Sequence, residues 1–213
     1  MRFARQQCRR GSILTPRMAD SQKSPFYLVR HGEAEPWPLP AYATPPGPPL
    51  TNQGRSDADG AGICLADALP DCPVKLVHSP MLRTRQTAET IASHLGAVKF
   101  ELDDRVMEIG PTETGESAQA RMVEFYRDAI GFLNEPLVLV GHRAPLEALL
   151  CYITAVAMPP RPKRGPLSPD CCFFMLPATI YRVDIEAATV ELVHGDTEWW
   201  DPVALKCVPR GRG

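Results

Sequence analysis

Three short runs rich in Val and Leu, separated by longer helix-like stretches, constrain the fold of this chain more than any other feature. The runs are FYLV (26–29), VKLV (74–77) and LVLV (137–140). Such runs are typical of strands buried on both faces of a sheet. The helix-like stretches lie near residues 53–68, 81–95, 116–134 and 145–157. Their alternation predicts an α/β fold, a three-layer αβα sandwich with a mainly parallel central sheet.

The C-terminal part of the chain has a different pattern. The segments CFFML, TIYRVDI and TVELV follow one another and predict extended structure at or near the edge of the sheet. Two proline-rich stretches, 36–49 and 159–169, interrupt the regular pattern, and the first contains seven prolines. Proline fits neither a helix interior nor a central strand, so we expect extended loops there.

Length and composition predict one globular domain. The chain has 213 residues, of which 44% are hydrophobic, and we expect the domain to span 25–207. Residues 1–24 are expected to form a basic leader, disordered or targeting, and residues 208–213 a disordered tail. The apolar stretches are shorter than the roughly 20 residues that a membrane-spanning helix needs, so no membrane partner is expected.

Charge and cysteine content narrow the class of protein further. Residues 1–20 hold five of the 23 basic residues and one of the 25 acidic ones, so the remainder has a net charge of −6. An acidic body is a poor nucleic-acid binder. The seven cysteines form no C-x-x-C pair, and no secretory signal is present, which predicts an intracellular protein with reduced thiols. We expect a cytoplasmic protein, with a mitochondrial location as the alternative because the leader is rich in arginine and almost free of acids.

The predicted strands end in residues that are able to do chemistry. The three tripeptides at their ends are Arg30-His31-Gly32, His78-Ser79-Pro80 and Gly141-His142-Arg143. The carboxyl ends of parallel strands meet at one edge of the sheet, where ligands bind in α/β folds. A lone histidine at a strand end is usually a surface residue. Two strand ends that each combine glycine, histidine and arginine instead indicate a functional site.

Four ordered blocks of sequence resemble a known family. They are RHGE (30–33), PLTNQGRSDA (49–58), HSPMLRTRQTAETI (78–91) and LVGHRAPLEALL (139–150). Together they resemble the histidine phosphatase superfamily, the phosphoglycerate-mutase-like phosphatases with an RHG motif. Four blocks spread over about 120 residues are more specific than the RHG motif alone.

The resemblance implies a phosphate pocket in which His31 is the nucleophile and forms a covalent phosphohistidine. Arg30, Arg83 and His142 are then phosphate ligands, and His142 also belongs to the catalytic set. The chemistry of these residue types agrees, because neutral imidazole is a nucleophile and guanidinium groups match phosphoryl oxygens. No cofactor is implied, and no metal-ligand spacing surrounds either histidine.

Several assignments around the pocket have competing interpretations. Arg83 and Arg85 lie on different faces of a predicted helix, so at most one enters the pocket, and the family motif favours Arg83. Thr51 either touches the phosphate or caps the helix that begins near residue 53. Gly32 fits a tight turn away from the strand, and Gly141 fits close approach of the backbone beside the phosphate.

A general acid is needed to protonate the leaving group. The segment RVMEIGPTETGES (105–117) resembles the part of the family that carries a glutamate, and Glu108 is the best match. Glu113 and Glu116 are competitors, and the alternative is a solvated acidic loop. The mutase branch has an asparagine six residues after the nucleophile, where this chain has Trp37, which argues against mutase activity.

We therefore predict a metal-independent phosphatase that hydrolyses phosphomonoesters, with a small phosphorylated substrate or a phosphoprotein as its partner. A phosphohistidine protein phosphatase of the short bacterial type is one alternative. A non-catalytic module that binds phosphorylated ligands is the other, although Arg30, His31, Arg83 and His142 are all present. The substrate and the oligomeric state cannot be inferred from the residues.

Overall fold

A six-stranded sheet forms the centre of the protein in the computed structural model, which describes residues 24–70, 72–131, 134–155, 175–195, 200–201 and 206–207. The strands follow the order β3-β2-β4-β1-β5-β6. Their bounds are β1 Phe26–Arg30, β2 Val74–His78, β3 Val98–Leu102, β4 Leu137–Gly141, β5 Ile180–Asp184 and β6 Thr189–His194. The first four run parallel, and β5 is antiparallel to both of its neighbours. A separate antiparallel pair joins β7 (Trp200–Asp201) to β8 (Lys206–Cys207).

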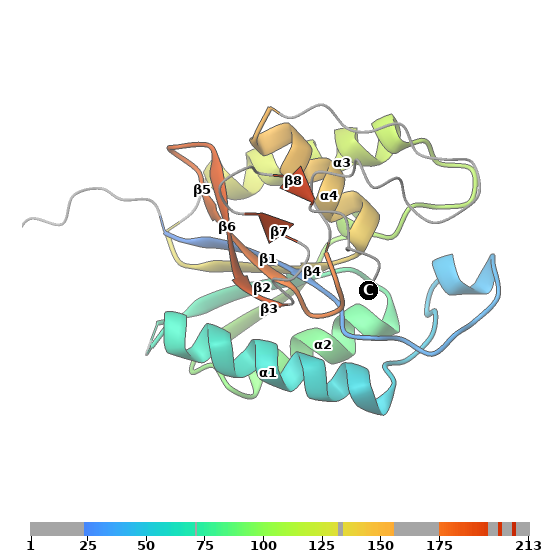
Figure 1. The fold of residues 1–213 in the computed structure, drawn as a ribbon, viewed down its shortest axis with the longest axis horizontal. Coiled ribbons are helices and arrows are strands. Elements are labelled where there is room, and N and C mark those ends of the chain that lie inside the picture. Colours follow the sequence, from blue (N-terminus) through green and yellow to red (C-terminus); the bar gives the residue numbers. More distant parts are fainter. Residues whose placement is uncertain are drawn as a thin grey trace, which may run out of the picture.

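Two layers of helices enclose this sheet (Figure 1). Helices α1 (Asn52–Ala68) and α2 (Leu82–Ala92) cover one face. Helices α3 (Gly115–Gly131) and α4 (Arg143–Ile153) cover the other. Two short 3₁₀ helices, η1 (Ala41–Ala43) and η2 (Asp104–Val106), lie in connections. The predicted three-layer α/β fold is confirmed, and each of the four helices overlaps a stretch predicted to be helical.

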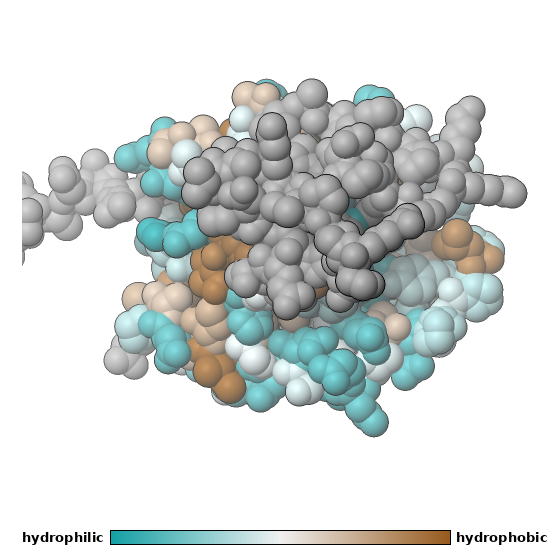
Figure 2. All heavy atoms as spheres, in the orientation of Figure 1, coloured by the Kyte–Doolittle hydropathy of each residue, from teal (hydrophilic) through white to brown (hydrophobic). Residues whose placement is uncertain are grey.

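The alternation of side chains along β1 shows why the sheet needs helices on both faces. Phe26 and Leu28 are fully buried in the core cluster that includes residues of α3 and α4. Tyr27 and Val29 point the opposite way, into the cluster that includes residues of α1 and α2. Complete burial of one such side chain contributes roughly 1.5–3 kcal/mol. Hydrophilic residues predominate over the N-terminal half of α1 on its exposed side (Figure 2).

Strand β3 was missed in the sequence because it has no continuous apolar run. Its residues VKFEL alternate between charged and apolar, and Phe100 and Leu102 are exposed. Four of its five residues are exposed, which fits a strand at the edge of the sheet that little else covers. By contrast, β5 and β6 lie at the other edge, as the segments TIYRVDI and TVELV predicted.

The first proline-rich stretch was expected to be wholly extended, and this was wrong in part. It contains one short 3₁₀ helix, η1, in which the amide of Ala43 donates to the carbonyl of Pro40 at 2.9 Å. A 3₁₀ turn tolerates proline at its start, where the missing N–H has no partner to lose. The second stretch, 159–169, lies outside the described residues, as do the first three residues of CFFML. Its last two, 175–176, are not in a strand.

The predicted leader and tail also fall outside the described part of the chain, except for residue 24. Within the part that is described, none of the helices combines the length and the apolar character needed to cross a bilayer.

Candidate active site

The site is built where the two central strands of the sheet end. Arg30, the last residue of β1, pairs in register with Gly141, the last residue of β4. The ladder continues by one bond, from the amide of His31 to the carbonyl of Gly141 at 3.0 Å. His142 follows Gly141 as the residue before α4. The rings of His31 and His142 therefore lie side by side, with centroids 5.2 Å apart.

His31 is held as a neutral imidazole with one ring nitrogen facing the site. Its side chain is buried, and Nδ1 lies 2.6 Å from the carbonyl oxygen of Gly32, to which it donates. Burial, together with the charges of Arg30 and Arg83, holds the pKa of His31 well below its ordinary value. Because Nδ1 carries the proton, Nε2 has the lone pair that a nucleophile needs.

Arg83 reaches the site from the first turn of α2 and is fully buried. Its Nε donates to Nε2 of His31 at 3.3 Å, and its Nη1 donates to the carbonyl of Tyr42 at 2.9 Å. Arg85 instead points to solvent and pairs with Glu89 at 2.7 Å. These positions agree with the prediction that at most one of the two arginines enters the site.

His142 is oriented by a serine at the end of the neighbouring strand. Its Nε2 lies 2.8 Å from Oγ of Ser79, and both residues are completely buried. Burial, followed by the nearby ring of His31 and the charge of Arg83, holds the pKa of His142 well below its ordinary value. Nδ1 of this neutral ring lies 3.7 Å from Oε2 of Glu108.

Glu108 enters the site from the loop after η2. Its Oε2 also lies 3.6 Å from Nη2 of Arg83, so this carboxyl group faces two of the predicted phosphate ligands. Arg121 on α3 supports the loop, because it donates to the backbone carbonyls of Arg105 and Glu108 at 2.5 and 3.4 Å. The loop therefore carries Glu108 to the ends of β1 and β4.

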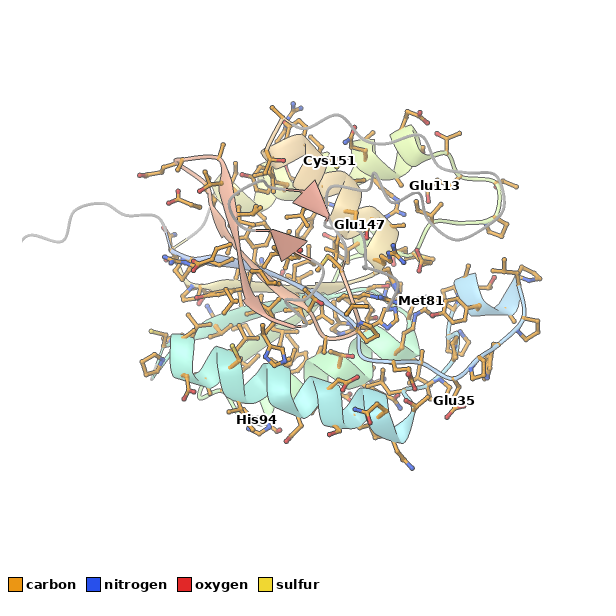
Figure 3. The ribbon with its side chains drawn as sticks, viewed as in Figure 1. Glu35, Met81, His94, Glu113, Glu147 and Cys151 are labelled. Atoms are coloured by element: carbon orange, nitrogen blue, oxygen red, sulfur yellow. The ribbon has the colours of Figure 1, made fainter. Side chains whose placement is uncertain are left out.

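The two competing glutamates have other positions. Glu113 forms a double contact with Arg121, at 2.7 and 2.9 Å, and accepts from the amide of Gly110. This pairing lowers the pKa of Glu113 and uses its oxygens for structure. Glu116 is exposed in the first turn of α3. Figure 3 shows Glu113 set apart from Met81, which lies at the carboxyl ends of the central strands.

Three buried donor atoms of the predicted phosphate ligands have no hydrogen-bond partner among the described residues. They are Nε of Arg30, Nη2 of Arg83 and Nδ1 of His142. Buried donors left without a partner are destabilising by about 1–3 kcal/mol each, so they are rare in folded proteins. An oxyanion with several acceptor oxygens, such as a phosphoryl group, can accept from more than one such donor.

Comparison with known proteins agrees with this geometry. Residues 26–112 match the family model described as the histidine phosphatase superfamily, branch 1. The resemblance to the histidine phosphatase superfamily is confirmed. A search among curated proteins finds no match to the chain.

Several solved structures share the fold. A mycobacterial glucosyl-3-phosphoglycerate phosphatase is 17% identical, with a TM-score of 0.59 over 79% of this chain and 96% of that one. YhfR of Bacillus stearothermophilus is 20% identical, with a TM-score of 0.59 over 81% and 97%. A proposed phosphohistidine phosphatase, SixA of Agrobacterium tumefaciens, is 17% identical, with a TM-score of 0.51 over 81% and 96%.

Thr51 and Gly32, two residues of the blocks that resemble the family, have structural roles. The hydroxyl of Thr51 caps α1 by accepting from the amide of Gly54 at 2.9 Å, and it donates to Glu33 at 2.8 Å. The cap is therefore present, and the hydrogen bonds that Thr51 forms with other described residues go to Glu33 and to the first turns of α1. Gly32 does not have a positive φ, so the predicted tight turn is not its reason. A Cβ there would lie 2.2 Å from the carbonyl oxygen of Gly54, which requires glycine.

Gly141 and His78 also differ from the predictions in their contacts. A Cβ on Gly141 would lie 3.2 Å from Leu146 of α4, so the close approach is to a side chain of the helix. His78 ends β2 but turns its Nδ1 to the carbonyl of Ser79 at 2.8 Å and packs edge-on against Phe100. Of the tripeptide at this strand end, the serine and not the histidine reaches the site.

Sequence reasoning missed the roles of Ser79 and Tyr42. Ser79 is separated from His142 by 63 positions, and only the adjacency of β2 and β4 brings them together. Tyr42 lies in a proline-rich loop that carries no recognisable pattern. The loop holds two aromatic residues, Trp37 and Tyr42, and nothing in the sequence distinguishes their roles.

Proposed function

We propose that this protein is a metal-independent phosphatase that hydrolyses phosphomonoesters through a covalent phosphohistidine on His31. The observation that carries the proposal is the set of three buried donor atoms without a hydrogen-bond partner, on Arg30, Arg83 and His142, together with the buried, neutral imidazole of His31. A pocket that only bound phosphorylated ligands would need the donors but not a buried, neutral imidazole oriented by its own backbone.

The first half of the reaction forms the phosphoenzyme. Nε2 of His31 must leave its 3.3 Å bond to Arg83 and attack phosphorus, while the bond from phosphorus to the leaving oxygen breaks. Glu108 gives a proton to that oxygen and becomes a carboxylate. The guanidinium groups of Arg30 and Arg83 and Nδ1–H of His142 stabilise the charge on the phosphoryl oxygens. The hydrogen bond from Nδ1 of His31 to Gly32 stabilises the positive ring that results.

The second half of the reaction releases phosphate. A water molecule attacks phosphorus from the side that the alcohol has left, and the carboxylate of Glu108 accepts the water's proton. The bond between phosphorus and Nε2 breaks, and the electron pair returns to His31. The enzyme is restored with a neutral His31 and a protonated Glu108, so the cycle balances without a cofactor.

The part of the proposal that concerns metal ions rests on the arginine side chains. Across the described residues, no group of three or more His, Cys, Asp and Glu side chains is arranged to hold a metal ion. The positive charge that a phosphoryl group requires comes instead from arginine side chains. Vanadate, which adopts the five-coordinate geometry of the transition state, is therefore expected to inhibit, and chelators are expected to leave activity intact.

The proposal is tested by trapping the intermediate. Rapid mixing of the wild type with ³²P-labelled substrate should give a phosphoenzyme that is labile in acid and stable in base, and His31→Ala should abolish both the label and turnover. His94→Ala is the matched control, because His94 pairs with Asp59 at the surface and lies away from the site (Figure 3). Turnover by His31→Ala, or loss of activity in EDTA that returns with a divalent ion, would contradict the mechanism.

A further inference from the structure

We infer that Tyr42 is the positioning residue for Arg83, and that the proline-rich stretch 36–49 exists to hold it there. This inference rests on the proposed function, because Arg83 is taken as a phosphate ligand. It assigns a role to a loop whose sequence predicts none.

Tyr42 contacts Arg83 in two independent ways. Its backbone carbonyl accepts from Nη1 at 2.9 Å, and its ring lies over the guanidinium, 4.4 Å from Cζ to the ring centroid. With Nε bound to His31, these contacts fix two of the three guanidinium nitrogens and one face of the plane. Nη2 is the nitrogen that remains: it faces Oε2 of Glu108 at 3.6 Å, and among the described residues it has no partner within hydrogen-bond distance. Tyr42 thus determines which nitrogen Arg83 presents to the phosphoryl group.

A stacked ring suits a buried guanidinium whose charge must stay available. Arg83 is fully buried, whereas the ring of Tyr42 is only partly buried and so lies between the guanidinium and solvent. An aromatic face attracts the cation without donating or accepting a hydrogen bond, so it does not compete with the ligand for Nη2. A carboxylate in the same place would neutralise the charge that the phosphoryl group needs.

The loop is built to keep Tyr42 in this position. Its base is closed by the hydrogen bond from the amide of Glu35 to the carbonyl of Pro49 at 2.9 Å and by the bridge between Ala34 and Leu50. In Figure 1 it extends as an arm beyond the carboxyl ends of the central strands. Seven prolines in 14 residues restrict the backbone, so less conformational entropy is lost when the arm is fixed.

The arm is also attached to the start of α2, the helix that carries Arg83. The amide of Leu82 donates to the carbonyl of Pro46 at 2.7 Å, next to Arg83 in sequence. Gly47 has a φ of +64°, and a Cβ there would lie 2.8 Å from Nη1 of Arg83. Glycine therefore serves both the backbone conformation and the space that the guanidinium occupies.

The test compares Tyr42→Phe, which keeps the ring and the carbonyl, with Tyr42→Leu, which removes the ring. Tyr42→Leu is expected to lower kcat/KM for p-nitrophenyl phosphate and to weaken vanadate binding by roughly 5- to 30-fold each, the range of a buried cation–π contact. Tyr42→Phe should change both by less than about twofold. Trp37→Leu is the control, since Trp37 is an exposed aromatic residue of the same arm that does not contact Arg83.

A double-mutant cycle with Arg83→Lys separates positioning from direct contact with the substrate. Lysine lacks the planar group that stacks under the ring. In the Arg83→Lys background, Tyr42→Leu should therefore lower kcat/KM and vanadate affinity by less than about twofold, as expected when one residue acts through the other. Vanadate binding measured by calorimetry gives the readout for Arg83→Lys if turnover becomes too slow. Equal losses in both backgrounds, or an unchanged Tyr42→Leu variant, would overturn the assignment.

Two results keep this test apart from the test of the proposed function. The wild type must form the phosphoenzyme on His31, and Tyr42→Leu must still form it, only more slowly. If the wild type forms no phosphoenzyme, the proposed function fails. If it does, and Tyr42→Leu forms it at the wild-type rate, the role of Tyr42 fails alone. Tyr42→Met provides a second flexible side chain of similar volume if the leucine variant has a lowered melting temperature.

Discussion

The hydroxyl of Ser79 lies against Nε2 of His142, and both side chains are completely buried. Oγ of Ser79 accepts a hydrogen bond from the amide of Met81 at 3.4 Å, and Nε2 of His142 lies 2.8 Å away. The hydroxyl hydrogen has no other acceptor among the described residues, so it points to Nε2. A neutral ring that accepts at Nε2 carries its own proton on Nδ1, the atom that faces the site. The serine thereby makes His142 a donor toward the phosphoryl group.

Replacement of Ser79 should release this tautomer. In Ser79→Ala, Nε2 has no donor, so the ¹⁵N shifts of His142 should move toward a mixture of the two neutral tautomers. We expect kcat/KM to fall by roughly 2- to 12-fold, the effect of one ordinary hydrogen bond. Ser79→Thr keeps the hydroxyl and is the matched control. An unchanged tautomer in the alanine variant would show that Ser79 does not set it.

The role of Glu108 is tested by the choice of leaving group. An alkyl alkoxide needs a proton as it leaves, whereas p-nitrophenolate does not. Glu108→Gln should therefore slow hydrolysis of an alkyl phosphomonoester by roughly 10²- to 10⁴-fold and barely change that of p-nitrophenyl phosphate. Glu113→Gln is the control from the same loop, and it should affect stability through Arg121 more than turnover.

Phosphohistidine as a substrate separates the two enzymatic interpretations. Its P–N bond is weak once solvent protonates the imidazole, so it needs no acid from the protein. If Glu108→Gln hydrolyses phosphohistidine at the wild-type rate and the wild type has no better ester substrate, a protein phosphohistidine phosphatase becomes the function. A uniform loss on every substrate would instead indicate that Glu108 supports the pocket structurally.

Acid should destabilise the fold through its two buried imidazoles. The pKa values of His31 and His142 lie well below 6.5 in the folded state, so both stay neutral there while the unfolded chain takes up protons. The unfolded state then binds more protons, and stability rises with pH and is lost as pH falls below about 6.5. Each imidazole contributes up to about 1.4 kcal/mol per pH unit in that window.

Melting curves at pH 7, 6 and 5 measure this effect. The wild type should lose stability over that range, and His31→Gln combined with His142→Gln should lose less, because its side chains do not titrate. Equal slopes for the two proteins would mean that these imidazoles are not held neutral. Turnover gives an independent readout. His31 should stay unprotonated well below pH 6.5, so kcat/KM should not fall through protonation of the nucleophile near pH 6.5, the ordinary pKa of histidine.

The sequence could predict the parts of this fold that local patterns determine. Runs such as LVLV predict strands that are buried on both faces of the sheet. The helices between them have apolar residues that repeat with the helical period. β3 was missed because its charged and apolar residues alternate over a short exposed segment. A loop can have the same pattern. Strand order was also beyond reach, because the adjacency of β2 and β4 depends on packing between distant segments.

The site divides in the same way. His31, Arg83 and His142 sit in the blocks that resemble the family, so their convergence could be predicted. The roles of Ser79 and Tyr42 depend on contacts across 63 and 41 positions that no motif encodes. Gly32 was singled out for a turn, whereas its contact with Gly54 is the physical reason for the glycine.

That glycine contact gives the sharpest test of how the fold supports the site. A Cβ on Gly54 would lie 2.0 Å from the carbonyl oxygen of Glu33 and 2.7 Å from its amide nitrogen, and neither backbone atom can move without displacing His31. Gly54→Ala should therefore destabilise the protein by about 3 kcal/mol or more and lower the melting temperature by roughly 6–12 °C. Turnover should fall as well in the fraction that remains folded.

Gly60 provides the matched control on the same helix. A Cβ there meets only the ring of His194 at 3.7 Å, which is ordinary contact. Gly60→Ala should thus stabilise the protein by about 0.5–1 kcal/mol, because alanine favours the helix over glycine, and leave turnover unchanged. If both alanine variants shift the melting temperature in the same direction, the contact between Gly54 of α1 and the backbone of Glu33 does not hold the nucleophile in place. If only Gly54→Ala loses stability and turnover together, the loss traces to that backbone contact.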